Sequence, residues 1–507
     1  MATVTLNRTL PPEVLDPADR WVESAAGASL PCFLLESAPS CGSVGDLPFP
    51  GRWTFAGRDP AAILSARRTA GGFRLDLRTL RDPLGRNPAG SPVRSWLGDP
   101  LEALRDLQAA YGHDPAAHPG DRPPFTGGLV GCFGYGLAHA VETLQPGPPD
   151  DLDLPDLIVM VADRVLAVDR HAGGATLWAT GRGTGPDDAR RAAEEALDAM
   201  EACCAGKKGP LRPPVRLEES DGDLGGDVHA QMSPQQYVDA VARCRQAILA
   251  GRIFEVCLTQ RLDMALQGTG WDLYRVLRST NPAPFAAYFR CGDLEVVSAS
   301  PERFLKLDED GIAETRPIKG TAPRGRTAVE DRRLSRRLAA SPKDRAENVM
   351  IVDLARNDLG RVCTTGSVRV PELCVVESYP TVHQLVSTVR GRLRPDRDAL
   401  DLVRACFPGG SMTGAPKIEA MKVIAELEPV ARGLYAGALG YLDRGGGLDL
   451  AMVIRTAVCT GGRAYFGVGG AVTADSDPAA EYREALDKAR ALIRAVRLLG
   501  GLEPQEE

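Results

Sequence analysis

Lys319 stands in the stretch TRPIKGTAPRG, residues 315–325, where prolines and glycines make a short, stiff and largely apolar turn. Lysine side chains usually lie on solvated surfaces, so this setting is unusual. Burial and a nearby cation both lower the pKa of a lysine from its free value of about 10.4, which releases a neutral amine. A neutral amine is a nucleophile, whereas a charged one only binds anions. Three interpretations therefore stay open: a surface charge, an anion clamp and a nucleophile.

Two pairs of carboxylates are spaced so that each pair shares one face of a helix. Asp344 and Glu347 are three residues apart, and so are Glu481 and Glu484 in the last long helical segment. Such pairs usually face solvent, but both segments also carry apolar stripes. If the two pairs face each other, they form an all-oxygen site suited to Mg²⁺.

Three further charged residues could bind or protonate an anionic substrate. Arg455 closes the apolar run LDLAMVIR, and the planar fork of an arginine matches a carboxylate. Lys488 stands four residues after Glu484, so it also fits an ordinary surface pair. Glu302, in SASPERF, ends a strand 17 residues before Lys319. In apolar surroundings its pKa would rise and suit a general acid, whereas in a solvated loop it would do no chemistry.

The composition excludes several classes of function. The formal net charge of -7 provides no overall basic field, which argues against a nucleic-acid partner. No apolar run reaches the roughly 18 to 20 residues that a membrane-spanning helix needs. The 12 cysteines include no C-x-x-C pair, which argues against a zinc site or a disulfide framework. We therefore expect a cytoplasmic protein without a membrane partner.

The chain divides into three parts that must position these residues. Residues 1–215 mix short apolar runs with Gly/Pro turns and read as a strand-rich N-terminal domain, which ends in a helix. Residues 216–232 are rich in glycine and acid and read as a linker. Residues 233–500 begin with a helix whose start is a capping box of Ser233 and Gln236, and continue with strands and further helices. The pattern indicates a mixed α+β class with antiparallel strands.

Taken together, the motifs of the third part resemble the chorismate-utilising enzymes. This family includes anthranilate synthase component I, aminodeoxychorismate synthase component I, isochorismate synthase and salicylate synthase. The resemblance is dense between residues 237 and 490, in SASPERF, TRPIKGTAPRG, DRAENVMIVDLARNDLGRV, FPGGSMTGAPKIEAM, MVIRTAV and ADSDPAAEYREALDKA. It implies a fold of two packed antiparallel β-sheets flanked by helices, with residues 233–500 as the chorismate-binding catalytic domain.

The resemblance implies a role for both carboxylate pairs. Glu347 and Glu484 would bind Mg²⁺ directly, and Asp344 and Glu481 would help through water. The metal would hold the ring carboxylate of chorismate. This role agrees with the all-oxygen donor set that the spacing suggests.

The family likeness also implies how the rest of chorismate would be bound. Lys488 and the backbone around Gly320 and Gly469 would complete the grip on the ring carboxylate. Tyr435 and Arg455 would bind the enolpyruvyl carboxylate. A dianionic substrate would thus meet one divalent cation, one arginine and one lysine.

The remaining implied residues concern the chemistry at the ring. Glu302 would protonate the leaving 4-hydroxyl group, and His383 and Thr413 would line the ring pocket. Gln260, in LTQR, would occupy the position where isochorismate and salicylate synthases carry a lysine base. Gln260 combined with Lys319 resembles the aminodeoxychorismate synthase subfamily, in which the lysine is proposed to attack C2 of chorismate. Anthranilate synthases resemble this chain elsewhere but have alanine at the position of Lys319.

The subfamily likeness implies an amination with ammonia, whose product leads to p-aminobenzoate and from there to folate biosynthesis or to a secondary metabolite. No cysteine lies in a glycine-rich nucleophile turn, and none of the 6 histidines has glutamate two residues later. We therefore expect a separate glutaminase subunit, and hence a heterodimer. Anthranilate synthase component I and a non-catalytic chorismate-binding protein remain the alternatives.

Three N-terminal residues match a motif of the family's tryptophan site. Leu34, Glu36 and Ser37 belong to the stretch FLLES, which forms part of that site in anthranilate synthases. A plain strand that ends in a turn explains the same residues. Two departures from the family pattern stand elsewhere: Glu255 where many relatives have glutamine, and Ala471 where many have glycine. Neither is expected to contact a residue assigned to chemistry.

Overall fold

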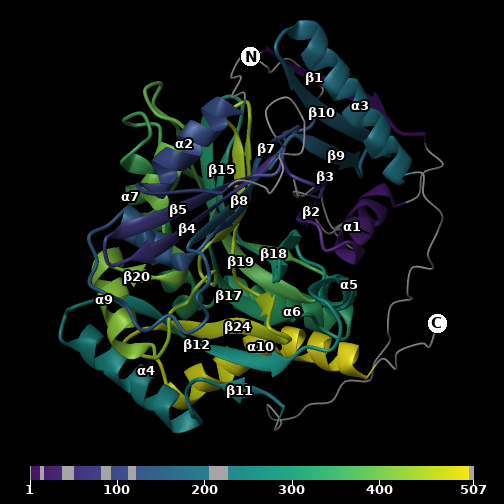
Figure 1. The fold of residues 1–507 in the computed structure, drawn as a ribbon. Helices are drawn as coiled ribbons and strands as arrows, with labels where there is room; N and C mark the ends of the chain where they lie inside the picture. The colour runs from purple at the N-terminus through teal and green to yellow at the C-terminus, as the bar shows by residue number, and fades with distance from the viewer. Residues whose placement is uncertain are drawn as a thin grey trace.

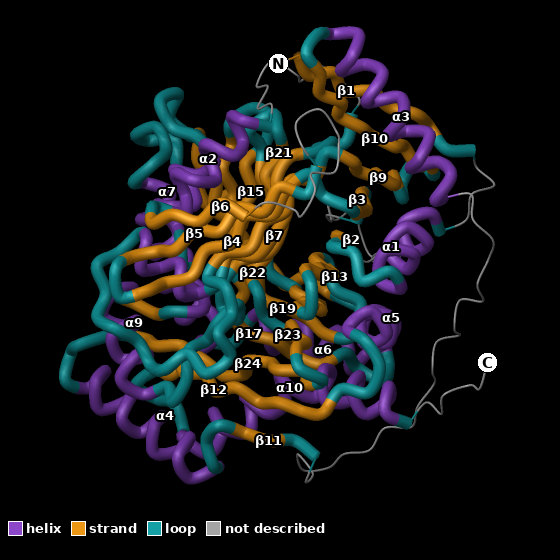
Figure 2. Tube along the Cα trace, in the orientation of Figure 1, coloured by secondary structure: helices purple, strands orange, loops and turns teal. Residues whose placement is uncertain are grey.

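The strands form two large antiparallel sheets that pack face to face, with helices on their outer surfaces (Figures 1 and 2). The computed structural model describes residues 2–11, 16–36, 51–81, 93–111, 122–204 and 227–501. Most of the predicted linker, residues 216–226, therefore lies outside the described residues. The predicted fold class, two packed antiparallel sheets with flanking helices, is confirmed.

The first sheet, sheet A, has twelve strands. In order across the sheet they are β1 (Ala2–Thr9), β10 (Gly174–Gly183), β9 (Arg164–Asp169), β3 (Trp53–Arg58), β2 (Cys32–Glu36), β13 (Phe285–Cys291), β14 (Leu294–Ser300), β23 (Thr456–Thr460), β24 (Arg463–Val472), β12 (Glu255–Ala265) and β11 (His229–Ala230), with β20 (Gly414–Ala415) paired to β12. Strands from before and after the predicted linker therefore form two blocks of one hydrogen-bonded layer, joined where β2 pairs with β13.

The second sheet, sheet B, also has twelve strands. In order they are β17 (Ile318–Pro323), β19 (Val382–Arg392), β16 (Ile312–Arg316), β15 (Arg303–Leu307), β22 (Leu448–Met452), β21 (Ala438–Asp443), β7 (Gly128–Phe133), β8 (Leu157–Ala162), β4 (Ala62–Thr69), β5 (Gly72–Thr79) and β6 (Val93–Leu97), with β18 (Arg369–Ser378) paired to β19. Sheet B likewise combines strands from before and after the linker.

The helices cover the outer faces of the two sheets. Those packed on sheet A are α1 (Pro17–Gly27), α3 (Pro186–Cys204), α4 (Pro234–Leu249), α5 (Gly270–Thr280), α9 (Lys417–Leu427) and α10 (Pro478–Gly500). The others are α2 (Pro100–Ala110), α6 (Ala328–Ala339), α7 (Pro342–Gly360), α8 (Ala399–Cys406), η1 (Tyr135–Ala140) and η2 (Gly410–Met412). Figure 1 shows α10 beneath β24 and β12, and α3 beside β1 and β10.

The central core lies between the sheets. Phe33 and Phe289 from sheet A meet Val130, Ile158 and Leu439 from sheet B, and all five side chains are buried. Burial of apolar surface stabilises a fold by about 25 cal/mol per Å². This inter-sheet layer therefore holds the two sheets, and the residues at their facing ends, in fixed relative positions.

Local sequence signals explain where the site-bearing helices begin. Ser233 and Gln236 form the predicted capping box of α4. Ser341 caps α7 by accepting a hydrogen bond from the backbone N–H of Asp344, and Asp477 caps α10 in the same way. The predicted helices at both carboxylate pairs are thus confirmed. Among the described helices, none has the length and apolar character needed to cross a membrane.

Candidate active site

A cavity of about 530 Å³ lies where β17, β24, α7 and α10 approach one another. Most of the sequence-predicted site residues line it: Glu302, Lys319, Gly320, Asp344, Glu347, Tyr435, Arg455, Gly469, Glu484 and Lys488. These residues come from separate stretches of the chain and from both sheets. The fold therefore brings the predicted acid, amine, carboxylates and cations to one cavity.

Glu302 stands in the turn between β14 and β15, and only 5% of it is exposed. Its Oε1 accepts a hydrogen bond from the Ser411 hydroxyl at 2.6 Å. Burial raises the pKa of Glu302 to about 7, although the Ser411 hydrogen bond and the Lys319 charge both oppose the rise. A carboxyl group with this pKa holds a proton near neutral pH and can donate it. Of the two alternatives that the sequence left open for Glu302, the structure shows the buried carboxyl group and not the solvated one.

Lys319 lies on β17 with only 9% of its surface exposed, and its Nζ donates a hydrogen bond to Glu255 Oε1 at 2.6 Å. Glu255 begins β12 and is inaccessible to solvent, so this ion pair joins sheet B to sheet A. Burial lowers the pKa of Lys319, but the carboxylates around it, above all Glu255, outweigh burial and raise the pKa. The predicted lowering of the Lys319 pKa is therefore wrong for the protein without bound metal or substrate, because the sequence does not reveal the buried carboxylate of Glu255.

Glu255 also corrects a second expectation. From the sequence, Glu255 is expected to depart from the family pattern without contacting a site residue. In the structure it pairs directly with Lys319. The available signal was the period-two alternation of a strand, which puts residues 255 and 257 on one face, and Cys257 lines the cavity. The pairing itself could not be read from the sequence, because the partners lie on different sheets.

The carboxylates of α7 and α10 face a common cation, the ammonium group of Lys343. Its Nζ lies 3.8 Å from Glu347 Oε1 and 3.5 Å from Glu481 Oε1. Glu481 is buried beside the cavity rather than among its lining residues. The two carboxylate pairs predicted from spacing therefore meet in space.

This carboxylate cluster fits a divalent cation in its chemistry. The buried oxygens Glu347 Oε1 and Glu481 Oε2 have no hydrogen-bond partner within the described ranges. Burial raises the pKa of Glu347 to about 7, which marks a carboxylate whose negative charge is not fully compensated. Over the same ranges, no three or more His, Cys, Asp or Glu side chains are already gathered in a metal-ligating arrangement. The donors are all oxygen, the type that Mg²⁺ prefers, but they are not drawn into a closed cage.

Arg455 and Lys488 supply positive charge beside the carboxylate cluster. The Arg455 guanidinium donates a hydrogen bond to the backbone oxygen of Lys488 at 2.8 Å. Lys488 pairs with Glu484 at 2.8 Å and also donates to the backbone oxygen of Gly469 at 2.9 Å. Burial raises the pKa of Glu484, but the charge of Lys488 outweighs it and lowers the pKa. Glu484 is therefore ionised, as a metal ligand must be.

Gly320 follows Lys319 on β17 and adopts a φ of 89°, a conformation that favours glycine. A Cβ atom at this position would lie 2.8 Å from Cβ of Asp344 on α7. The glycine therefore lets the β17 backbone lie directly against the first turn of α7. That contact sets the position of Lys319 relative to the carboxylates.

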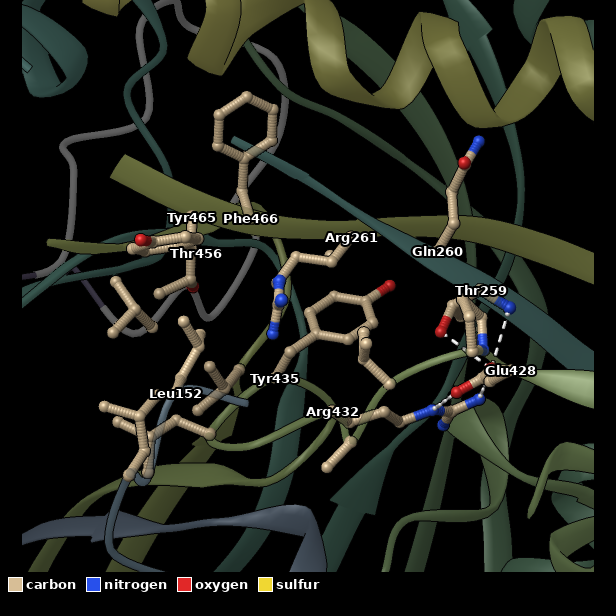
Figure 3. A pocket seen from close by; sticks show the side chains of 18 residues that line it. Leu152, Thr259, Gln260, Arg261, Glu428, Arg432, Tyr435, Thr456, Tyr465 and Phe466 are labelled. Carbon is tan, nitrogen blue, oxygen red and sulfur yellow. Dashed lines mark hydrogen bonds and ion pairs between the residues drawn. The ribbon is translucent and has the colours of Figure 1, made fainter. Parts of the chain in front are cut away.

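Gln260 does not line the cavity but borders a smaller neighbouring pocket, which shares Tyr435 and Gly467 with the cavity. Figure 3 shows the Gln260 side chain pointing away from Tyr435, whereas Thr259 points to the buried Glu428. The alternation of a strand explains this difference. The predicted catalytic position of Gln260 stays a prediction.

Thr413 and His383 also lie outside the lining of the cavity. Thr413 is inaccessible, and its backbone oxygen accepts a hydrogen bond from Cys257 N–H at 2.9 Å. His383 contacts the Ser378 hydroxyl at 2.8 Å and the Asp331 carboxylate at 3.0 Å through its two ring nitrogens. Both residues support the backbone near the cavity, and their roles at the substrate ring stay predictions.

The proposed tryptophan motif lies on β2, within sheet A. Leu34 is inaccessible to solvent. The carboxylate of Glu36 accepts hydrogen bonds from Arg170, Tyr274 and Arg278. Ser37 lies outside the described residues. Tryptophan binding at this motif stays a prediction.

Known proteins resemble this chain along most of its length. The sequence profile described as chorismate binding enzyme matches residues 73–494. An aminodeoxychorismate synthase of Streptomyces pristinaespiralis is 47% identical over 376 residues, which cover 74% of this chain and 51% of that protein. A second one, of Streptomyces griseus, is 42% identical and covers 91% of this chain and 60% of its own length. The chain thus spans only about half to three-fifths of these relatives.

Relatives named for another activity are nearly as similar. Anthranilate synthase component 1 of Mycolicibacterium smegmatis is 39% identical, over 92% of this chain and 85% of that one. Among solved structures, anthranilate synthase component I of Streptococcus pneumoniae has a TM-score of 0.71 at 30% identity, and covers 90% of this chain and 95% of its own. The family profile matches most of the sequence, and the match to the Streptococcus pneumoniae enzyme covers most of both chains. The chain therefore belongs to the chorismate-binding enzyme family.

Proposed function

We propose that the protein is component I of aminodeoxychorismate synthase, which converts chorismate and ammonia to 4-amino-4-deoxychorismate for the formation of p-aminobenzoate. The observation that carries this proposal is Lys319, whose buried amine lines the same cavity as the buried acid Glu302. A nucleophile and a general acid in one enclosed site suit the displacement of a hydroxyl group.

The charges around the cavity suit a dianionic substrate. Arg455 would hold the enolpyruvyl carboxylate together with the Tyr435 hydroxyl, and Lys488 would lie at the ring carboxylate. Glu347 and Glu484 would hold Mg²⁺ directly, with Asp344 and Glu481 through water, and the bound ion would neutralise the ring carboxylate. Together these groups would fix the ring with its 4-hydroxyl toward the acid.

The amination then proceeds in two displacements at the ring. The lone pair of neutral Lys319 forms a bond to C2, the ring double bonds shift, and the C4–O bond breaks. Glu302 donates its proton, so that the hydroxyl leaves as water. Ammonia forms a bond to C4, the double bonds shift back, and the bond between C2 and Lys319 breaks. The new ammonium group returns one proton to Glu302, so chorismate and ammonia yield the amino product and water.

Ammonia would come from a separate glutaminase subunit. Two kinds of relative carry the name component 1, which implies a second component in those enzymes. The present chain would form a heterodimer with such a subunit in the cell. The isolated chain should use free ammonia, because the chemistry at the ring is complete without glutamine.

Anthranilate synthase component I is the second candidate function. Relatives with that name are 39% and 40% identical over 92% of this chain, close to the values for the aminodeoxychorismate synthases. That activity aminates C2 and eliminates pyruvate, so it would leave no role for an amine at Lys319. A non-catalytic chorismate-binding protein is the third alternative, and it would leave no role for a protonated Glu302.

One assay separates the three candidates. The purified chain is incubated with chorismate, Mg²⁺ and an ammonium salt, and the product is identified by mass and fluorescence. We expect 4-amino-4-deoxychorismate, whereas anthranilate or unchanged chorismate would select one of the alternatives. Lys319→Ala tests the covalent step: if this variant forms the amino product at the wild-type rate, Lys319 is not the nucleophile.

A further inference from the structure

Glu255 lies directly behind Lys319 as seen from the cavity. Lys319 lines the cavity, whereas Glu255 does not, and Glu255 is fully inaccessible. The Nζ–Oε1 distance of 2.6 Å is that of a strong, charge-assisted hydrogen bond. A proton can therefore move from the amine to this carboxylate without entering the space that the substrate fills.

The Glu255–Lys319 pair is poorly suited to a purely structural role. Taking two charges out of water costs more than their attraction returns unless every polar atom is satisfied. Glu255 Oε2 has no hydrogen-bond partner in the parts of the chain that are described. A second buried pair, Lys417 with Asp358 at 2.7 Å, differs because Lys417 also donates to the backbone oxygen of Cys406.

Other titratable groups face Lys319 from three further directions. Cys257 lies on the same strand as Glu255, Glu302 lies in the turn after β14, and Glu347 and Glu484 come from α7 and α10. None of these groups is a suitable acceptor for the proton of Lys319. Glu302 must hold its own proton for the leaving group, and the two glutamates of the helices carry the proposed metal. Burial raises the pKa of the Cys257 thiol, which keeps it neutral.

We propose that Glu255 is the proton acceptor and positioning partner of Lys319, which converts the resting ammonium into the nucleophilic amine. This inference rests on the proposed function of Lys319. Before attack, one proton passes from Lys319 Nζ to Glu255 Oε1, which leaves a neutral amine and a neutral carboxylic acid. When ammonia expels the amine from C2, the same proton returns from Glu255 to Lys319. The pair therefore ends each turnover as it began, and no proton is exchanged with solvent.

The test compares Glu255→Gln, Glu255→Asp and a control, Asp358→Asn, which breaks the other buried lysine–carboxylate pair. Consumption of chorismate by the full chain is followed in a single turnover with Mg²⁺ and a constant concentration of free ammonia, over a range of pH. In Glu255→Gln the proton of Lys319 can leave only to water, so each pH unit changes the fraction of neutral amine about tenfold. We expect the Glu255→Gln rate to rise about tenfold per pH unit while the amine is mainly charged, a limb that the wild-type profile lacks. Loss of the Glu255 carboxylate also lowers the pKa of Lys319, which moves this limb toward lower pH without removing it.

The two other variants separate a proton acceptor from a structural contact. Glu255→Asp keeps a carboxylate, so we expect the wild-type shape of the pH profile at a reduced rate. Asp358→Asn should lower the melting temperature without changing the shape of the profile. A Glu255→Gln profile that has the wild-type shape would overturn the inference, whatever its effect on melting temperature. If Lys319→Ala is itself fully active, the proposed nucleophilic role of Lys319 fails first, and this failure is distinct from a failure of the role of Glu255.

Discussion

Glu302 offers the sharpest test of the chemistry, because Glu302→Gln removes its proton while keeping its shape. The Ser411 hydroxyl, which lies 2.6 Å from Glu302 Oε1, can donate equally well to the amide oxygen of glutamine. The fold and the binding of chorismate should therefore survive. Only the transfer of a proton to the leaving hydroxyl is lost.

The expected magnitude follows from the proposed role and from the raised pKa. A positioned general acid contributes about 10²–10⁴ in rate, so the barrier should rise by about 3–5 kcal/mol. The pKa of Glu302 is about 7, and the reactive form is the protonated one. The wild-type rate should thus fall as pH rises through 7, by about tenfold for each further unit. Glu302→Gln should lack this descending limb.

The assay is the first-order loss of chorismate in a single turnover, with Mg²⁺ present and free ammonia held constant across the pH range. Glu295→Gln is the matched control: Glu295 is a buried glutamate on β14 that accepts from Tyr288 and from the backbone of Gly270, outside the cavity. That variant should keep the descending limb. A Glu302→Gln enzyme that reacts within threefold of the wild-type rate, or that keeps the limb, would refute the assignment of Glu302.

Two further predictions concern the frame of the site. Gly320→Ala should abolish chorismate binding and lower the free energy of unfolding. The added Cβ would lie 2.8 Å from Asp344, so the loss should exceed the roughly 1–2 kcal/mol of left-handed backbone strain. Gly311→Ala is the control, because Gly311 has a φ of 73° and open space around it, so this variant introduces the backbone strain alone. If the two variants lose equal free energy of unfolding in chemical denaturation, the clash is contradicted. Glu347→Gln should weaken Mg²⁺ binding at least about tenfold in calorimetric titration, because a charged oxygen donor is lost. Unchanged affinity, equal to that of the exposed control Glu426→Gln, would remove Glu347 from the metal site.

The sequence predicted the fold class and many residues of the cavity lining because ordered motifs carry both. The capping residues Ser233, Ser341 and Asp477 mark helix starts through purely local hydrogen bonds, so they can be read from the sequence. The spacing of Glu347 relative to Asp344 is equally local. These features depend on a few neighbouring residues and not on the rest of the chain.

The contacts that decide the chemistry depend instead on packing between distant elements. Glu255 meets Lys319 only because β12 and β17 belong to sheets that face each other. Lys343 reaches Glu481 only because the start of α7 lies against α10. Spacing along the chain has no information on such pairs, so the sequence alone assigns Glu255 no contact with the site.

The order of strands also constrains how the chain reaches its native state. Strand β2 pairs with β3 on one side and with β13 on the other, and β7 pairs with β8 and with β21. A ribosome must add roughly 250 residues after β2, and roughly 300 after β7, before each second neighbour exists. Until then each strand has one edge with unpaired backbone N–H and C=O groups, which can pair with strands of other chains. Completion of both sheets, and with them the cavity, must therefore wait until nearly all of the described chain has been synthesised.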